Sequence, residues 1–560
     1  MRRIIYIIAM GAIMTSSLWA QSQDSLLTRQ MELDRNFNPT LLESNKINSL
    51  PTLREPVVQK ANTNYSTWNV NATPPLEIAI PRAGTINTQI PYSKERGYIY
   101  LSGGNYANID GVVGYRILDK EQDKLAVNFF HNSTNGNINY IQTIGEDKTK
   151  ANVMNNMGEI KYNHYFEKIV LNTHASYLHS MYNYYGNTMG DLPQLDGNNQ
   201  QVGIFNLNLG IDPTKNSQFE YRGFVDFKYF TNKYAQSLID DPLKGNQIEA
   251  MVGFKKPYGT NDGGFGIDGN ILNANYSNKD LKNYLLVAAK PYVDFRGDNW
   301  QAKLGADVLF HILGKTQIRV VPNVQLKYAP VYLNIKGGYD SNTFIDMFEE
   351  SRYVLPNSIV TPSFSIVDID GGVEITNLKG FRFDVFGGFK QTTDEHFLVM
   401  QKDAESGLTR EFLTPLYNDL LHSHIGARIQ STIWSPLNVA LSLKKNFYTM
   451  KDSNDNGSME GAKAWNKPGF EADVRAELSI IEGLKLTLNY YLATDRWTYY
   501  DDSNVKMDNI NDLNLGAVYQ ISNSFAVNLK ANNILAQKYD IWYGHPAQGM
   551  NVMGGFSFKF

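Results

Sequence analysis

Most of the chain repeats one pattern, in which apolar and polar residues alternate along short segments. Every second residue from Ala302 to Ile312 is apolar, and the residues between them include Lys303, Asp307 and His311. Successive side chains of a β-strand point to opposite faces, so such a segment has one apolar and one polar face. The division recurs at residues 285–296, 484–495 and 525–532. Because charges stay on one face of each segment, the pattern predicts a transmembrane β-barrel with lipid outside and water inside.

Short turns and long polar stretches alternate between these segments. Tight turns are expected at 297–299, 328–330 and 481–483, among others. Outer-membrane barrels have short periplasmic turns and long extracellular loops. We therefore place the longer polar stretches outside the cell, at residues 182–201, 340–361, 391–421 and 499–511.

The segments from Tyr98 to Phe560 give an all-β fold, an antiparallel barrel of about 22 strands. An even number lets the first and last strands both end in the periplasm. Glu395 to Gln401 also has a strand-like sequence, but we assign it to an extracellular loop.

The N-terminus has the features of an export signal. Arg2 and Arg3 precede an apolar run, and small residues lead to an expected cleavage between Ala20 and Gln21. The run is too short to span a bilayer as a helix, which takes about 20 apolar residues. We expect a signal peptide at 1–20, an extended N-terminal segment at 21–95 and the barrel at 96–560. An exported barrel of this kind belongs to the outer membrane of a Gram-negative cell.

Composition removes several classes of function. The chain has no Cys, which excludes disulfides, a thiol nucleophile and a thiolate metal site. The net charge is -4 and no block of basic residues occurs, so nucleic acid is not an expected partner. The 34 Tyr and 28 Phe suit the aromatic girdles at the two membrane interfaces. No cofactor is expected.

The C-terminal sequence resembles the end of a TonB-dependent receptor. The residues that carry the likeness are Asn532–Leu535, Lys538–Tyr539, Trp542–Pro546, Gly549 and the alternating Phe556, Phe558 and Phe560. In that family an Asn-rich strand, a loop with Tyr, Pro and Gly, and an aromatic strand form the last hairpin. The three phenylalanines are also the expected signal for the barrel-assembly machinery. Residues 97–106 resemble the first strand of shorter barrels of this type from Bacteroidota.

The resemblance implies a barrel that takes up a bound ligand and an N-terminal plug that gates it. Only some 75 residues separate Gln21 from Arg96, too few for the usual plug, so a truncated or absent plug is expected. Asp24 to Thr28 is the nearest candidate for a segment that contacts TonB, and coupling to TonB stays open. A barrel of this width without a plug is an open channel, so we expect the N-terminal segment and long loops to enter the lumen.

Several groups of residues are candidate sites. Aromatic residues in two long loops could face a ligand, and they are Tyr182, Tyr184, Tyr185, Trp497, Tyr499 and Tyr500. The alternative is that they belong to the outer aromatic girdle. Residues 452–457 match the start of a calcium loop, but Lys463 stands where the motif needs Glu. His422 and His424 share a face without a third metal ligand. No nucleophile is paired with a histidine, so we expect no enzyme. Because a third ligand is missing, we also expect no resident metal.

Two functions follow from these expectations. The first is binding or transport of a solute across the outer membrane, with selectivity from inward polar residues and from the loops. The alternative is a barrel that does not transport and serves as a scaffold or subunit of a complex that assembles outer-membrane proteins or lipoproteins. Expected partners are outer-membrane lipids, the barrel-assembly machinery, and a surface lipoprotein or other subunits of such a complex.

Overall fold

The computed structural model describes residues 95–141, 148–185, 199–214, 219–233, 243–258, 263–278, 281–313, 315–355, 358–378, 380–403, 410–434, 436–451, 463–479 and 481–560. The predicted signal peptide, nearly all of the N-terminal segment and the calcium-loop motif at 452–457 lie outside these residues.

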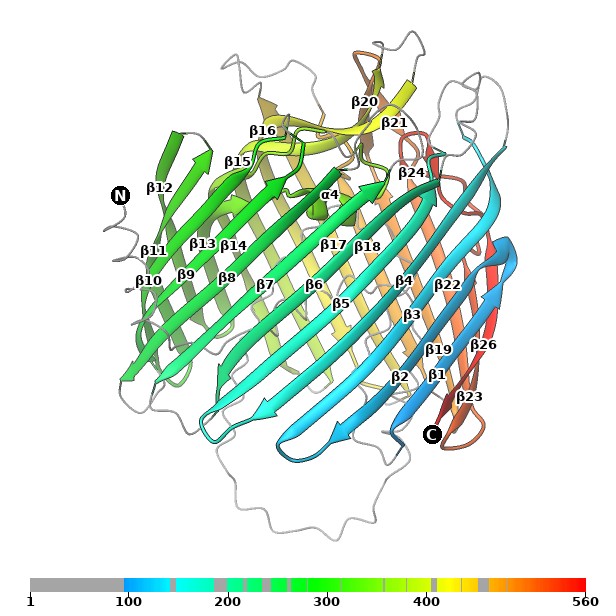
Figure 1. The fold of residues 1–560 in the computed structure, drawn as a ribbon, viewed down its shortest axis with the longest axis horizontal. Coiled ribbons are helices and arrows are strands. Elements are labelled where there is room, and N and C mark those ends of the chain that lie inside the picture. The colour runs from blue at the N-terminus through cyan, green and yellow to red at the C-terminus, as the bar shows by residue number, and fades with distance from the viewer. Residues whose placement is uncertain are drawn as a thin grey trace.

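The described chain forms one 22-stranded antiparallel sheet that closes on itself (Figure 1). This confirms the predicted fold and strand number. The barrel strands are β1 (Gly97–Gly104), β2 (Ile109–Asp119), β3 (Asp123–Asn139), β4 (Lys148–Tyr165), β5 (Ile169–Asn183), β6 (Asn199–Pro213), β7 (Glu220–Lys233), β8 (Leu243–Tyr258), β9 (Gly263–Tyr276), β10 (Tyr284–Arg296), β11 (Trp300–Leu313), β12 (Lys315–Tyr328), β13 (Val331–Asp340), β14 (Ser363–Leu378), β15 (Phe381–Asp403), β16 (Arg410–Ser431), β17 (Leu437–Lys451), β18 (Phe470–Leu478), β19 (Leu484–Thr494), β22 (Ile510–Gln520), β23 (Phe525–Asn532) and β26 (Asn551–Lys559).

The remaining elements lie in the connections between barrel strands. They are a 3₁₀ turn, η1 (Asn105–Ala107), a short helix, α4 (Phe344–Glu350), and two small hairpins, β20 (Arg496–Tyr500) with β21 (Ser503–Met507) and β24 (Asp540–Trp542) with β25 (His545–Pro546). Among the described residues, no helix is long and apolar enough to cross a membrane.

The alternation of the sequence determines which side chains face outward. On β11, Leu304 and Ile312 are exposed on the outside, while Asp307 and His311 are buried on the inside. Large apolar side chains are exposed in the same way on strands around the barrel, for example Phe129, Ile160 and Val225. Such an apolar outer belt over a polar interior is what a lipid bilayer requires of a barrel.

Strands β1 and β26 close the barrel. Their ladder runs from Tyr98 opposite Lys559 to Gly104 opposite Met553, and Gly97 and Phe560 exchange backbone hydrogen bonds of 2.8 and 2.9 Å. The ring of Phe560 lies over Gly97, where a Cβ atom would meet it at 2.5 Å, and stacks on Tyr115 at 6.3 Å between centroids. The terminal phenylalanine therefore covers the junction between the first and last barrel strands.

Replacing Phe560 with alanine should lower the amount of closed barrel several-fold, because the junction of β1 and β26 loses its apolar cover. The heat-dependent gel mobility of the outer-membrane fraction measures folded barrel directly. Phe166→Ala, in an exposed turn at the same end of the barrel, is the control and should behave as wild type. Equal folding of both variants would show that Phe560 has no part in closure or assembly.

The two ends of the barrel differ. At the end where the chain enters and leaves the sheet, connections are tight turns such as 166–168, 297–299 and 522–524, as predicted; we call this the turn end. At the other end, the loop end, the longest connections join β5 to β6, β13 to β14, β17 to β18, β19 to β22 and β23 to β26.

One assignment from the sequence was wrong. Glu395 to Gln401 is not an isolated loop segment but part of β15, and its residues pair with Phe412 to Asn418 of β16. The ladder between the two strands shifts register between Thr392 and Glu395 and then continues. Pairing with a distant segment of the chain, which alternation alone does not reveal, extends both strands beyond the wall.

Candidate functional site: a roof over the mouth of the barrel

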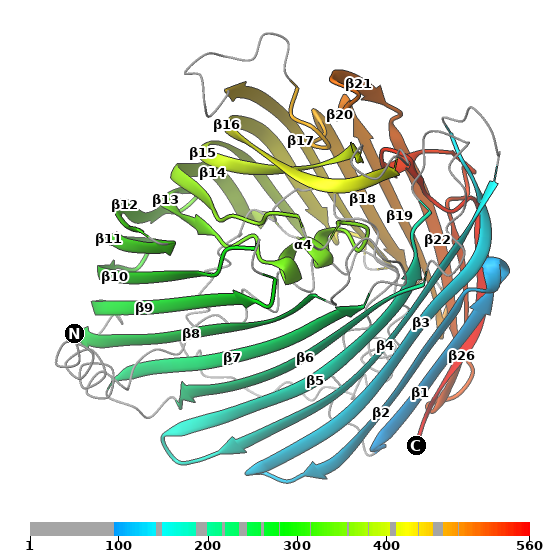
Figure 2. The ribbon, with the colours of Figure 1, turned by 45° about the horizontal axis from the view of Figure 1, so that its top comes forward.

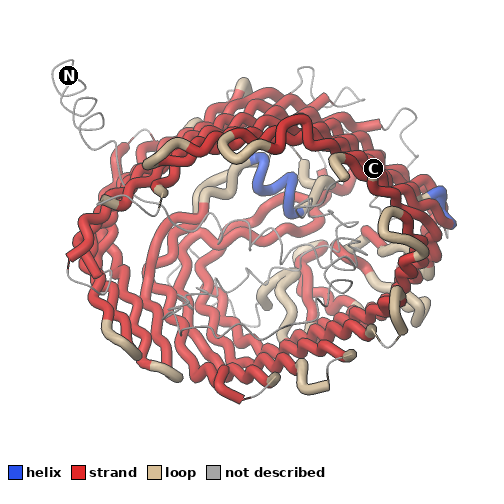
Figure 3. The backbone as a smooth tube through the Cα atoms, turned by 90° about the horizontal axis from the view of Figure 1, so that it is seen from below, coloured by secondary structure: helices blue, strands red, loops and turns tan. Residues whose placement is uncertain are grey.

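Several connections of the loop end cover the mouth of the barrel. Figure 2 shows the ends of β15 and β16 crossing above the lumen, and Figure 3 shows α4 inside the ring of strands. We call the following set the roof: the ends of β15 (Glu395–Asp403) and β16 (Arg410–Asn418), the loop 341–362 with α4, the segment 463–469, the β20–β21 hairpin and the loop 533–550.

The roof begins at a line of irregularities in three adjacent ladders. Gly338 of β13 pairs with Ser365 of β14, which pairs with Thr392 of β15, and each ladder shifts register beside this row. Bulges bend the strand that carries them. Asp394, just beyond Thr392, has a positive φ of 54°, a conformation uncommon for residues other than glycine. We call this row the crease, because β15 and β16 continue over the lumen beyond it (Figure 2).

The helix α4 is attached to the inner wall. A capping box starts it: the Thr343 hydroxyl accepts from the Asp346 amide at 3.2 Å, and the Thr343 amide donates to Asp346 at 2.8 Å. Phe344 stacks on Phe230 of β7 with centroids 4.6 Å apart, and Ile345 is buried in the same cluster. The amphipathic helix therefore fills part of the lumen, as expected for one of the long loops.

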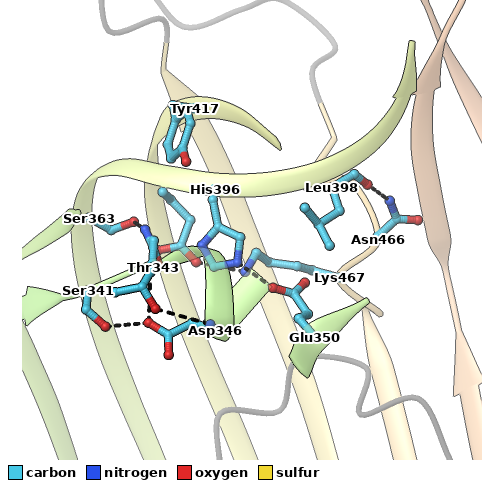
Figure 4. Close-up of polar contacts among 12 residues, drawn as sticks. Ser341, Thr343, Asp346, Glu350, Ser363, His396, Leu398, Tyr417, Asn466 and Lys467 are labelled. Atoms are coloured by element: carbon cyan, nitrogen blue, oxygen red, sulfur yellow. Dashed lines mark hydrogen bonds and ion pairs between the residues drawn. The ribbon is translucent and has the colours of Figure 1, made fainter. Parts of the chain in front are cut away.

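A side-chain contact joins α4 to β15 above it, and an ion pair joins β15 to the segment 463–469 (Figure 4). Glu350, at the end of the helix, lies 2.7 Å from His396 Nε2 of β15, and Lys467 Nζ lies 2.8 Å from Glu395. Asn466 donates from its side chain to the Leu398 carbonyl. A narrow cleft runs between these groups, with Phe397, Trp465 and Trp542 as further lining.

The far side of the roof is held by Arg496. Its side chain is fully buried and donates to three carbonyl oxygens, those of Asp508 at 3.0 Å, Asp540 at 2.8 Å and Ile541 at 2.7 Å. Trp465 donates to Asn504 at 2.8 Å and so connects the hairpin to the segment 463–469. Together with Glu350, His396 and Lys467, these contacts link every roof element to its neighbours.

Three of the predicted loop aromatics lie at the end of β5 and pack against the roof. Tyr182 is 1% exposed, Tyr185 is 7% exposed, and Tyr184 packs against them. Tyr353 and His545 complete the cluster, with centroids 5.2 Å and 5.5 Å from Tyr185. In this conformation these rings join loops that are distant in sequence. Contact with a ligand stays a prediction for them.

The other three predicted aromatics lie on or beside the β20–β21 hairpin. Trp497 is half-buried, and Lys463 Nζ lies over its ring, 5.2 Å from the centroid. Tyr499 lies 4.8 Å from Trp465, and Tyr500 lies 5.0 Å from Tyr543 of the last loop. All three remain partly accessible and are nearer to solvent than Tyr182 and Tyr185. Their role in binding is likewise not tested by the structure.

The inner wall is lined by cations paired with carboxylates. Lys255 and Asp294 are 3.2 Å apart and almost fully buried, and Arg296 lies 2.8 Å from the same carboxylate. Further pairs follow the wall at Lys290–Asp307, Lys336–Asp368, Arg382–Glu374, Arg428–Asp384 and Lys530–Asp110. The lumen is therefore strongly polar while most of its charges are balanced locally.

The histidine pair of β16 has protein partners. His422 Nε2 is 3.0 Å from the Asn446 side chain, and His424 Nε2 is 3.2 Å from Asp370. The rings face each other with centroids 5.4 Å apart. Within the described residues, no group of three or more His, Asp or Glu side chains is arranged to hold a metal ion.

The burial of Asp540 predicts that docking of the last loop depends on pH. Burial raises the pKa of its carboxyl to about 7, and the nearby Asp508 adds to the rise, against the Gly544 amide and Arg496, which lower it. The carboxyl of an undocked loop titrates near 3.8. The docked loop therefore binds an extra proton between these two values, and docking weakens as pH rises from about 4 to about 7.

We expect the roof to be tighter at pH 5 than at pH 8. A cysteine at Ser442, on β17 opposite Arg428 of the inner wall, should react from outside more slowly at pH 5, relative to an exposed reference cysteine at each pH. Asp540→Asn should remove this difference because the amide does not titrate. A difference that persists in Asp540→Asn would assign the pH dependence to another group.

Comparisons with known proteins bear on the barrel fold. No family model and no curated protein sequence matches the chain. Similar solved structures include the copper transporter OprC, with 11% identity over 83% of this chain and 80% of that chain and a TM-score of 0.59. The siderophore receptor PirA from Acinetobacter baumannii has 9% identity over 83% and 80%, with a TM-score of 0.63. The ferric enterobactin receptor PfeA from Pseudomonas aeruginosa has 9% identity over 84% and 82%, with a TM-score of 0.61.

The barrel has the fold of a TonB-dependent receptor. At about 10% identity, this likeness concerns the path of the chain and carries over none of the sites of those receptors. The residues that shape the mouth here are this chain's own.

Sequence reasoning missed Arg496, Glu350, His396 and Lys467, which hold the roof together. One signal was available, because Thr343 and Asp346 have capping-box spacing and precede the apolar Met347 and Phe348 within a predicted loop. The others had none, since their partners are distant in sequence.

Proposed function

We propose that this protein is an outer-membrane transporter of the TonB-dependent receptor type, with entry to its lumen controlled by the roof. The barrel lies in the outer membrane with the loop end outside the cell. A solute binds at the roof and passes along the polar inner wall. The protein moves its solute without chemical change and is not an enzyme.

The observation that carries this proposal is a wide polar lumen closed by loops that side-chain contacts hold in place. A lumen lined by partly exposed ion pairs, such as Lys290–Asp307 and Lys336–Asp368, is suited to a hydrated path. A roof that rests on a few hydrogen bonds and ion pairs can exchange them for contacts with a ligand. The fold shared with metal and siderophore receptors supports transport over other uses of a barrel.

We further propose that residues 1–20 are removed as a signal peptide, that residues 21–95 form a short segment in place of a full plug, and that the barrel is of the shorter type found in Bacteroidota. Coupling to TonB through this segment is then weak, or a partner such as a surface lipoprotein takes the place of TonB. Phe556, Phe558 and Phe560 act as the signal for the barrel-assembly machinery. Ligand contact by the loop aromatics belongs to the same proposal, and these are Tyr182, Tyr184, Tyr185, Trp497, Tyr499 and Tyr500.

Gentle purification of the tagged protein from its native outer membrane tests the proposal. A transporter should be recovered alone, with an energising protein, or with one lipoprotein that captures ligand. Recovery in fixed ratio with subunits that assemble outer-membrane proteins or export lipoproteins would make the barrel a scaffold and overturn the proposal.

A further inference from the structure

Two carboxylates face each other across the inner wall of the barrel below α4. Asp226 of β7 and Glu249 of β8 are directly opposite in the ladder between these strands. Val225 and Val252 are exposed on the outer face, so Asp226 and Glu249, an odd number of residues away, face the lumen. Side chains directly opposite in an antiparallel pair have Cβ atoms about 4.5–5.5 Å apart, and like charges there repel. The wall therefore holds an unfavourable pair of negative charges.

A single lysine offsets this pair. Lys228 lies two residues from Asp226 on the same face, with its Nζ 3.6 Å from the Asp226 carboxylate. Glu249 has no ion pair within 4.0 Å among the residues that the structure describes, although Lys228 and Lys290 act on it from farther away. Lys290 is itself 3.9 Å from Asp307. One carboxylate of the opposed pair is therefore left without a cation of its own.

The helix α4 adds negative charge at the same place. Phe344 fixes the start of the helix on β7 by stacking on Phe230, the next inward residue after Lys228. The carboxylates that act on the Lys228 ammonium are accordingly those of Glu349, Asp226, Asp346 and Glu249. Four negative charges thus lie around one positive charge. We call these five residues, Lys228 and the four carboxylates, the acidic patch.

A buried amide oxygen beside the acidic patch lacks a hydrogen-bond donor. Gln247 lies directly opposite Lys228 and two residues from Glu249, on the same inward face. It is 4% exposed, and its Oε1 accepts no hydrogen bond from any described residue. A buried acceptor without a donor is costly. The acidic patch and its surroundings are therefore rich in acceptors and short of donors.

This arrangement suits an organic cation better than a metal ion. Within the described part of the chain, no three carboxylates or histidines are placed to hold one metal ion. The acceptors are spread along the wall instead, since Gln247 and Glu249 are separated by about 7 Å of strand. An ammonium or guanidinium group carries several N–H donors that reach separate acceptors. Glu349 is exposed and Glu249 is half-buried, so a solute in the lumen can reach them.

We propose that the acidic patch binds a positively charged organic group of the transported solute, an ammonium or a guanidinium. Glu249 and the carboxylates of α4 hold the group, and Gln247 Oε1 is a further acceptor. Charge complementarity carries the assignment, because one bound cation relieves the repulsion between Asp226 and Glu249 and gives the amide oxygen a donor. The inference rests on the proposed function, since it places the acidic patch on the path of the solute below the roof.

The test measures binding without transport. Met251→Cys places the only cysteine of the chain two residues from Glu249 on the same inward face. The reaction of this thiol with the uncharged reagent methyl methanethiosulfonate is followed in the folded, full-length protein in detergent. N-acetyl-arginine amide is the cationic probe. N-acetyl-citrulline amide is its matched analogue, because a neutral urea group replaces the guanidinium.

The arginine probe should slow the reaction at least fivefold at saturation, and the citrulline analogue should not slow it. Glu249→Gln should weaken this protection at least tenfold without unfolding the barrel, because it also removes the repulsion with Asp226. Heat-dependent gel mobility confirms that each variant is folded. Glu374→Gln is the matched control, since Glu374 is a half-buried glutamate of the inner wall that already pairs with Arg382. It should leave the protection unchanged.

A second variant tests the amide oxygen. Gln247→Leu removes the acceptor at nearly the same side-chain size and should weaken protection by the arginine probe several-fold. Equal protection by the two probes, unchanged protection in Glu249→Gln or Gln247→Leu, or equal protection by calcium ions alone would overturn the proposal. Loss of solute flux with intact protection would count against the proposed function, whereas loss of protection with intact flux would count against the acidic patch.

Discussion

Replacing Arg496 with alanine is expected to raise access to the lumen by about a hundredfold. The guanidinium donates to three carbonyl oxygens of two different connections, and alanine removes all three bonds. Hydrogen bonds from a charged group contribute about 1.5–3 kcal/mol each, and they are not additive. A loss of roughly 3 kcal/mol shifts the population of the open roof by about two orders of magnitude.

The measurement uses the absence of native cysteine. A single cysteine at Ser442 is labelled in intact cells with a maleimide too large for general porins, and its rate is compared with and without Arg496→Ala. Arg475→Ala is the matched control, because Arg475 pairs with Asp473 at 2.9 Å on the barrel wall and takes no part in the roof. Equal rates in all three proteins would mean that Arg496 does not keep the mouth closed.

Locking the roof should have the opposite effect. Val354 of the α4 loop and Leu413 of β16 form a parallel bridge, and Leu355 donates to the Leu413 carbonyl at 2.8 Å. A disulfide between cysteines at 354 and 413 would tie the loop to the end of β16. We expect the oxidised form to label at Ser442→Cys at least tenfold more slowly than the reduced form, because the roof then cannot lift.

The control for this lock lies in the wall. Val331 and Val373 face each other across β13 and β14 below the crease, and both are exposed on the outer face. A disulfide there should leave the labelling rate unchanged in both redox states. If the roof lock also has no effect, solute does not enter by movement of the α4 loop.

The barrel wall was predictable from the sequence because its rules are local. Alternation at Leu304 and Asp307 decides which side faces lipid, and the aromatic Phe560 marks the last strand. The tight turns at 297–299 and 522–524 follow from the same local rules. The number of strands follows from counting such segments, so the 22-strand barrel needed no knowledge of distant contacts.

The roof was not predictable in this way. The crease depends on Gly338, Ser365 and Thr392 being neighbours, which a reading of single segments does not show. The continuation of β15 through Glu395 depends on pairing with residues that follow a long connection. Arg496 has a charged side chain that composition would place in solvent, and it is buried because carbonyl oxygens from two connections converge on it.

The upper part of β12, residues 315–322, does not pair with β13. It has one sequence signal that becomes clear only with the structure. Pro322 stands in the middle of an otherwise regular alternating strand, and proline in a sheet marks an edge. Without knowledge of the neighbouring ladder, the same residue could equally mark a bulge. The inward Leu309 and Val321 likewise depart from the polar inner face of other strands.

The central claim is that the lumen is a route for solute and that the roof closes it. Flux of small neutral solutes into proteoliposomes tests this most directly, with wild type, Arg496→Ala, and Arg496→Ala lacking residues 21–94. Wild type should admit solute slowly, and at least one of the two opened proteins should admit it ten times faster or more. If all three proteins are equally impermeable although folded, the lumen is not a path for solute and the barrel serves as a scaffold.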